Sequence, residues 1–225
     1  MKINYCLPII RKSKKEVLEM INNNLNEYQY FEVWLDPITD LDKPFIQDIL
    51  ELLNERLIVL FQRGKNEYKR IDKDIKRKLL SHLNNTNVLI DLDISESDEI
   101  KYIKENKLNL KTIISYHNYD KTPEDLLEIV THMETINPTI YKISTFCNTE
   151  HDALKLLELQ LILKQKNKRY IVLGMGKFGT ITRVYGTLWG NEIIYAPKTK
   201  DEASAPGQLT KQELEKILRI LVPNP

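Results

Sequence analysis

Lys142 and His117 are the residues whose types and places are best suited to chemistry. Lys142 interrupts the apolar run at residues 140–143, and His117 ends the preceding apolar run. A lysine held away from water can act as a neutral amine and attack a carbonyl carbon, and a nearby imidazole can move protons for the resulting imine. A lone lysine in a strand more often points outward and extends its amine to solvent. The catalytic interpretation of Lys142 therefore depends on His117.

Short apolar runs alternate with longer amphipathic runs along the whole chain. The runs typical of strands are residues 3–9, 28–35, 57–62, 87–93, 111–116, 139–144, 169–175 and 192–195. The runs typical of helices are residues 13–26, 43–54, 72–83, 97–106, 122–136 and 149–166, a short turn at 183–188, and 210–221. This alternation predicts an α/β fold of parallel strands joined by crossover helices. We expect a (β/α)8 TIM barrel in a single domain over residues 1–225, with an open doubly wound sheet as the alternative.

Two helix starts are marked by local sequence. Thr122 is followed by Pro123 and two acidic residues, which is typical of a helix that begins with an N-cap and a proline in its first turn. Thr149 precedes Glu150 and Asp152 in a similar way. No glycine-rich phosphate loop follows the first predicted strand, which disfavours a dinucleotide-binding fold.

In a barrel of this kind the carboxyl ends of the strands meet at one mouth, where the active site lies. Charged or polar residues occur at nearly every one of these predicted ends. They are Glu32 and Asp36, Arg63 and Glu67, Asp91 and Asp93, His117, Lys177 and Arg183, and Ser204 and Gln208, with Lys142 inside the sixth strand. Packing of a core alone does not predict this distribution.

The overall composition excludes several other functions. Lysine and arginine number 33 against 32 acidic residues, so a net charge of +1 gives no field directed at nucleic acid or a membrane surface. The basic stretch Lys65–Lys78 is interpreted as a solvated loop and helix face. Cys6 and Cys147 are too few for a disulfide framework, and we expect buried free thiols in a cytoplasmic protein. No apolar run predicts a signal peptide or a membrane span. The four histidines share no metal-ligand spacing, and His82, His132 and His151 lie on predicted helices.

Four segments, taken together and in order, resemble type I 3-dehydroquinate dehydratases. They read SYHNYDKTP at 115–123, YKI at 141–143, GMGKFGTITR at 174–183 and ASAPGQ at 203–208. The amino-terminal half is similar but less faithful. EVWLD at 32–36 has Trp34 where the family has an arginine, and Arg63 and Glu67 match a strand-three pair that lacks its usual following glycines.

The resemblance implies dehydration of 3-dehydroquinate in the shikimate pathway of aromatic amino acid biosynthesis. Lys142 would form the Schiff base, His117 would transfer protons, and Glu67 would orient His117. Arg183 would bind the substrate carboxylate, Ser204 and Gln208 would belong to a closing loop, and Glu32 and Arg63 would hold ring hydroxyls. The resemblance implies no metal and no organic cofactor, no nucleic-acid or membrane partner, and a homodimer in the cytoplasm.

Two other functions stay open on the sequence. A Schiff-base aldolase on the same fold would use a similar lysine, although the histidine and the ASAPGQ segment favour the dehydratase. A catalytically weakened barrel kept for binding is supported by Trp34, because an indole cannot supply a cation or a bidentate fork. Loss of one charged hydrogen bond would cost about 1.5–3 kcal/mol, which slows an enzyme without abolishing its chemistry.

Overall fold

The computed structural model describes residues 3–61 and 71–222. It divides into two compact units, which are described separately. The carboxy-terminal unit contains Met1–Pro8 and Ile114–Pro225, and the amino-terminal unit contains Ile9–Ile113. The single domain predicted over residues 1–225 stays a prediction.

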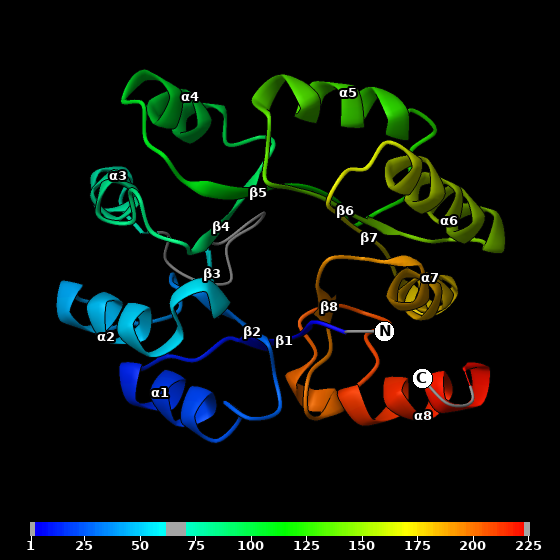
Figure 1. Ribbon diagram of the computed structural model, residues 1–225, viewed down its shortest axis with the longest axis horizontal. Coiled ribbons are helices and arrows are strands. Elements are labelled where there is room, and N and C mark those ends of the chain that lie inside the picture. The colour runs from blue at the N-terminus through cyan, green and yellow to red at the C-terminus, as the bar shows by residue number, and fades with distance from the viewer. Residues whose placement is uncertain (1–2, 62–70, 223–225) are drawn as a thin grey trace. The chain divides into compact units, whose positions relative to one another are not determined.

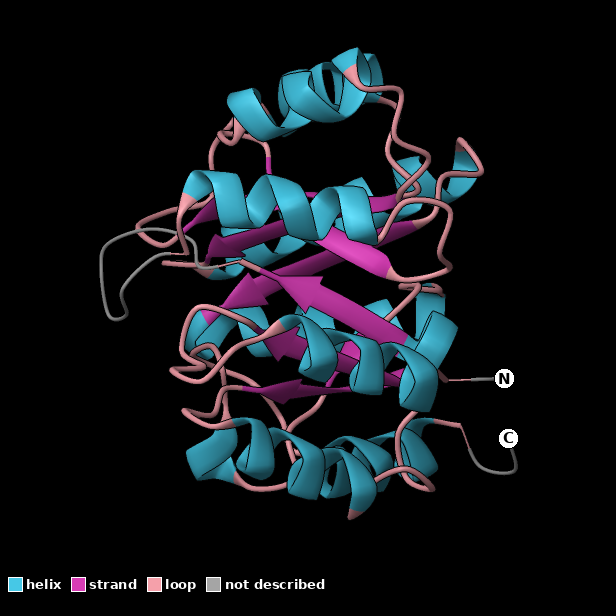
Figure 2. Cartoon of the chain, turned by 90° about the vertical axis from the view of Figure 1, so that its left-hand side faces the viewer, coloured by secondary structure: helices cyan, strands magenta, loops and turns pink. Residues whose placement is uncertain are grey.

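Strands and helices alternate in both units (Figures 1 and 2). The amino-terminal unit contains α1 (Lys14–Asn22), β2 (Tyr30–Trp34), α2 (Lys43–Leu53), the 3-10 turn η1 (Asn54–Arg56), β3 (Leu57–Leu60), α3 (Lys73–His82), β4 (Leu89–Asp93) and α4 (Ser97–Glu105). The carboxy-terminal unit contains most of β1 (Tyr5–Ile9) and β5 (Lys111–Asn118), then α5 (Leu126–Ile136), β6 (Ile140–Phe146), α6 (Glu150–Gln165), β7 (Tyr170–Met175), α7 (Gly176–Trp189), β8 (Ile194–Tyr195), η2 (Lys200–Glu202) and α8 (Lys211–Leu221).

The strand pairs are parallel and mostly follow chain order. In the carboxy-terminal unit the sheet order is β7-β6-β5, and β1 pairs with β8. In the amino-terminal unit, β3 lies between β2 and β4. In the carboxy-terminal unit, Lys142 of β6 is in register with Ile171 of β7, and Cys6 of β1 is in register with Tyr195 of β8. Within the described residues the alternation contains eight strands, as the sequence predicts for a (β/α)8 barrel.

Strands β6 and β7 of the carboxy-terminal unit are buried on both faces. All six residues of β7 are buried, and so are the first six of β6. Parallel strands covered on both faces have near-continuous apolar sequences rather than a simple alternation, which explains the run at 170–175. Against this background Lys142 is exceptional, because it is a charged residue type within a buried strand.

The predicted helix start at Thr122 is wrong. Helix α5 begins at Leu126, and its N-cap, Asp125, makes no side-chain capping bond. The Thr122 hydroxyl is instead bound to Thr145 and to the carbonyl of Phe146, so a tertiary contact uses the group that local sequence offers as a cap. The start predicted at Thr149 is confirmed, since Thr149 and Asp152 form a reciprocal capping box.

The short turn predicted at 183–188 is also wrong, because a full helix, α7, extends from Gly176 to Trp189. Glycine and β-branched residues make this segment a poor helix former by intrinsic propensity. Packing overrides that tendency. A Cβ atom at Gly179 would lie 2.4 Å from the carbonyl carbon of Gly174, so only glycine permits β7 and α7 to approach this closely. The Gln160 side chain adds hydrogen bonds to Val172 and Thr182.

The Cys6 and Cys147 side chains are buried and free of disulfide bonds, as predicted. Among the described residues, no helix combines the length and the apolar character needed to cross a membrane.

The contact between Gly174 and Gly179 predicts a large effect from one added methyl group. Gly179→Ala should lower the free energy of unfolding by about 1–3 kcal/mol, because backbone atoms must move to admit the new Cβ. Urea unfolding measures this change. Ile181→Ala, on an exposed position of the same helix, should change the free energy by less than about 1 kcal/mol. Equal effects at the two positions would contradict the close-packing account.

Candidate active site

Lys142 lies on the face of β6 that is turned away from the helix covering the strand. Its neighbour Tyr141 faces the helix side, where the Tyr141 hydroxyl accepts a hydrogen bond from Lys168, just after α6. Side chains alternate between the two faces of a strand, so Lys142 points to the opposite face. The Lys142 side chain does not extend outward between helices, because the residue is only 5% exposed.

The Lys142 amine contacts Tyr195 at the end of β8. The Nζ atom donates a hydrogen bond to the Tyr195 Oη atom at 3.0 Å. The same Nζ lies 4.2 Å from the centroid of the Tyr195 ring, within the range of a cation–π contact. The lysine is therefore held by both the hydroxyl and the aromatic face of one side chain.

His117 lies near the end of β5, the strand next to β6 in the sheet order. It is half-buried, and its ring stacks on Tyr119 with centroids 6.0 Å apart. The sequence prediction that Lys142 and His117 occupy adjacent strands is confirmed. Their roles in proton transfer and imine formation stay predictions.

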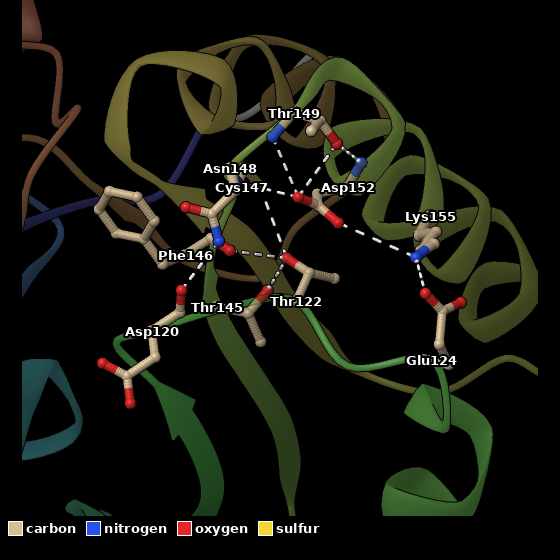
Figure 3. A network of polar contacts seen from close by, with 10 residues as sticks. All are labelled: Asp120, Thr122, Glu124, Thr145, Phe146, Cys147, Asn148, Thr149, Asp152 and Lys155. Atoms are coloured by element: carbon tan, nitrogen blue, oxygen red, sulfur yellow. Dashed lines mark hydrogen bonds and ion pairs between the residues drawn. The ribbon is translucent and has the colours of Figure 1, made fainter.

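A polar network ties the segment after His117 to the end of the lysine strand (Figure 3). The Thr122 Oγ1 atom lies 2.8 Å from the Thr145 hydroxyl and donates to the Phe146 carbonyl at 3.0 Å. The Asn148 amide donates to the Asp120 carbonyl at 2.8 Å. These bonds join the β5–α5 segment to the end of β6, and so they position the histidine strand relative to the lysine strand.

The same network continues into α6. The Asp152 carboxylate accepts from the backbone amides of Asn148 and Thr149, and Lys155 pairs with Glu124 on the segment before α5 (Figure 3). The Thr149 hydroxyl in turn accepts from the Asp152 amide. The first turn of α6 thus fixes the chain as it leaves β6.

Arg183 is a buried cation on α7. The residue is 6% exposed, and its Nε and Nη2 atoms have no hydrogen-bond partner in the described parts of the chain. Burial lowers the pKa of the Arg183 guanidinium to about 10, so the group remains charged at neutral pH. A buried charge without a carboxylate partner is costly, and proteins retain such groups chiefly where they serve a function. The arrangement suits an anionic ligand, which a guanidinium binds with two parallel hydrogen bonds.

Cys147 lies close to Arg183, just beyond β6. Burial raises the pKa of the Cys147 thiol, and the hydrogen bond between this thiol and the Thr122 hydroxyl and the charge of Arg183 oppose that rise. The thiol thus stays protonated at neutral pH and behaves as a small packing group rather than as a nucleophile.

The segment after β8 folds onto the start of α7. The Gly176 amide donates to the Pro206 carbonyl at 3.1 Å, and the Thr180 hydroxyl donates to the Gly207 carbonyl at 3.2 Å. Gly207 has a φ of +78°, and a Cβ there would lie 2.5 Å from the Gly176 oxygen. Glycine at 207 therefore satisfies both a left-handed backbone and a close contact.

Within this segment, Ser204 and Gln208 bind each other. The Gln208 Oε1 atom accepts from the Ser204 backbone amide at 2.8 Å, and the Gln208 Nε2 donates to the Ser204 hydroxyl at 3.2 Å. Gln208 is buried, at 5% exposure. The pair forms a closed turn whose polar groups are already positioned.

These contacts bring several predicted site residues to one end of the carboxy-terminal unit. A Cβ at Gly176 would lie 2.8 Å from the Phe146 ring, so the end of β6 lies against the start of α7. The turn holding Ser204 and Gln208 lies against that same glycine, and Arg183 interacts with Cys147, the residue after Phe146. Lys142 is on the same face of β6 as Phe146, farther back along the strand.

Glu32 and Trp34 lie together in the amino-terminal unit, on β2. The Trp34 Nε1 atom donates to the Glu32 Oε2 atom at 3.1 Å, and Glu32 is 2% exposed. Where the resemblance leads one to expect an arginine, the indole thus supplies one neutral donor to the buried carboxylate. The predicted site residues Arg63 and Glu67 lie outside the described residues.

Tyr195 is the contact that the sequence interpretation missed. It ends the eighth predicted strand, and the sequence analysis assigned it no role. A hydroxyl-bearing residue at the carboxyl end of a barrel strand is the signal that could have identified it. Among the described residues, no group of three or more histidine, cysteine, aspartate or glutamate side chains gathers in a way that could hold a metal ion.

Solved structures establish the class of fold. A type I 3-dehydroquinate dehydratase from Clostridium difficile, carrying covalently modified comenic acid, aligns with a TM-score of 0.80 and 25% identity over 98% of this chain and 92% of that chain. The 3-dehydroquinate dehydratase from Geobacillus kaustophilus HTA426 also gives a TM-score of 0.80, with 19% identity over 98% and 91% of the two chains. The predicted (β/α)8 barrel fold is confirmed.

Sequence relatives identify the family. The type I 3-dehydroquinase family model matches residues 5–225. A 3-dehydroquinate dehydratase from Methanococcus maripaludis strain C7 is 29% identical over 222 residues, which cover 96% of this chain and 99% of that protein. The chain belongs to the type I 3-dehydroquinase family, whose members are hydro-lyases, and the suspected resemblance is confirmed.

The buried charge of Arg183 predicts a gain in stability when it is removed. Burial lowers its pKa in the folded protein to about 10, so the charge opposes folding below about pH 10, and this cost fades as the pH rises from 10 towards the ordinary pKa of a guanidinium. At pH 7, Arg183→Met should raise the free energy of unfolding by on the order of 1–3 kcal/mol. Urea unfolding with Arg169→Met, an exposed ion-paired control, provides the comparison. A destabilised Arg183→Met would show that the guanidinium stabilises the fold.

The Thr122 hydroxyl predicts a loss of stability when it is replaced by a methyl group. Thr122→Val leaves the Thr145 hydroxyl and the Phe146 carbonyl without this partner, which should lower the free energy of unfolding by about 1–3 kcal/mol. Thr131→Val, which removes an exposed hydroxyl bonded to Leu127 within α5, should cost less than about 0.5 kcal/mol. Matching values for the two variants would exclude the network as a support of the site.

Proposed function

We propose that this chain converts 3-dehydroquinate to 3-dehydroshikimate through an imine on Lys142, as a step of the shikimate pathway. The observation that carries the proposal is the buried Lys142 side chain, turned away from the covering helices and held at its amine. A second cation, the buried guanidinium of Arg183, suits the substrate carboxylate, since its Nε and Nη2 atoms have no hydrogen-bond partner among the described residues. The family membership supplies the identity of the substrate.

In the proposed reaction the neutral Lys142 amine attacks the C3 ketone of the substrate. The carbon–nitrogen bond forms, the carbonyl oxygen leaves as water, and a protonated imine remains. This imine withdraws electrons from the neighbouring carbon, so His117 can remove a proton from C2. The electrons of that bond form an enamine with the imine carbon. The enamine electrons then form the C1–C2 double bond and restore the protonated imine, while the C1 hydroxyl departs as water with the proton from His117. Water then hydrolyses the imine and regenerates the lysine, so the net change is loss of one water.

The remaining predicted residues would bind and enclose the substrate. The Ser204 and Gln208 turn is attached to the start of α7, close to the end of β6, which suits a role in covering a ligand. Glu32 and Arg63 would bind ring hydroxyls, and Glu67 would orient His117. The cytoplasmic location and the homodimer expected from the resemblance stay predictions.

Trp34 supports one alternative, a weakened member of the family. Its indole donates a hydrogen bond to Glu32, so the carboxylate keeps a donor at this position. The indole lacks the charge and the second donor of a guanidinium. We therefore expect the imine chemistry to be retained, with a KM higher than that of the Trp34→Arg variant. The side chains that bind the substrate hydroxyls affect binding rather than imine formation.

A dehydration assay tests the proposal. Absorbance of the conjugated enone should rise when the protein is mixed with 3-dehydroquinate, and Lys142→Ala should reduce kcat by at least about a thousandfold because the electron sink is lost. Lys168→Ala, which removes a lysine from the opposite, helix-covered side of β6, is the matched control and should leave kcat within about twofold.

Turnover of a sugar-phosphate aldol in place of 3-dehydroquinate would favour an aldolase. No turnover of either compound by a folded protein would favour the weakened barrel kept for binding. Full activity in Lys142→Ala would refute the role of the lysine.

A further inference from the structure

We propose that Tyr195 is a further catalytic residue, which accepts a hydrogen bond from the imine nitrogen on Lys142 and places its ring against the imine charge. The inference rests on the proposed function and deepens it. It starts from the two contacts that Tyr195 makes with the same nitrogen, the hydrogen bond at 3.0 Å and the ring contact at 4.2 Å.

The hydrogen bond suits every state of the nitrogen during imine formation. A lysine ammonium carries three N–H groups, the neutral amine carries two and the protonated imine carries one. Because the Tyr195 oxygen acts as acceptor, one N–H can stay bound to it in all three states. This hydrogen bond also orients the amine, because holding one N–H group limits the directions in which the nitrogen lone pair can point.

The aromatic ring would stabilise the positive charge of the protonated imine, a role separate from the hydrogen bond of the hydroxyl. The protonated imine is a cation, and its charge is what draws electrons from the carbon next to the former ketone. A ring face at this distance attracts a cation, and the attraction increases where water is excluded. Lys142 and Tyr195 are 5% and 6% exposed, so water is largely excluded from their contact.

The position of Tyr195 is fixed by the sheet. It is the last residue of β8 and is in register with Cys6 of β1, which is fully buried. The backbone amide of the next residue, Ala196, donates to the Cys6 carbonyl at 3.1 Å. A tyrosine held on a rigid strand can keep its oxygen at hydrogen-bond distance with little further ordering, which favours a preorganised role.

Two substitutions separate the hydroxyl from the ring. Tyr195→Phe keeps the ring and removes the acceptor, whereas Tyr195→Leu removes both. Tyr170→Phe is the matched control, because Tyr170 is also buried in this unit and donates its hydroxyl hydrogen bond to the Trp189 carbonyl, on the helix that follows its strand. Unfolding midpoints in urea establish that each variant is folded.

The experiment measures imine formation directly. Protein is mixed with saturating 3-dehydroquinate, quenched with borohydride at timed intervals, and the adduct on Lys142 is quantified by mass. Loss of a hydrogen bond to a charged group predicts that Tyr195→Phe lowers the rate of adduct formation and kcat by about tenfold to a hundredfold. Tyr195→Leu should be slower again, and Tyr170→Phe should match the wild type. KM should change less than kcat, because the imine exists only after binding.

Adduct formation by the wild type tests the imine chemistry, whereas the rate of adduct formation in each variant relative to the wild type tests the role of Tyr195. If the wild type forms an adduct and Tyr195→Phe forms it at the same rate, the role of Tyr195 is overturned and the imine chemistry stands. If Tyr195→Phe and Tyr170→Phe are slowed equally, the effect is structural and the role is again overturned. A wild type that forms no adduct overturns the imine chemistry and the role of Tyr195 together.

Discussion

The contact between the Lys142 amine and Tyr195 is the interaction that holds the proposed reactive amine within its buried strand. Lys142 is a charged residue type on a buried strand, where an amine without polar or aromatic partners would be strongly destabilising. The tyrosine supplies an oxygen and a ring face to that amine. The alternation of β6, with Tyr141 facing the helix side, then determines that Lys142 faces the other way.

A buried cation and a close glycine contact lie near this strand. Arg183 is a buried cation whose burial lowers its pKa, and two of its donors have no partner within the described residues. The start of α7 approaches β7 so closely that only glycines fit at 174 and 179. The close approach at the glycines brings α7 and its guanidinium near the end of the lysine strand. Burial of that guanidinium opposes the stability of the fold.

Local pattern predicted most of the fold and several site residues. Apolar runs and β-branched residues located the strands, and the strand carrying Lys142 was recognised because a charged residue type interrupts an apolar run. Only a short turn at 183–188 was predicted where the helix at 176–189 forms, and the glycines and β-branched residues of this segment favour a helix only once it packs on β7. Thr122 was mistaken for a cap, because its true partners lie on another strand.

The contact partner of the lysine could not be predicted from local pattern. Tyr195 is 53 residues from Lys142 in the chain, and only the tertiary fold brings β8 within reach of the amine. The two predicted site residues that lie outside the described part of the chain, Arg63 and Glu67, stay predictions.

Trapping of the imine tests the central claim most directly. Wild-type protein treated with 3-dehydroquinate and borohydride should gain the mass of one reduced, covalently bound ligand, and peptide mapping should place that mass on Lys142. An adduct on a different residue, or an unmodified protein that still converts substrate to the enone, would contradict the account.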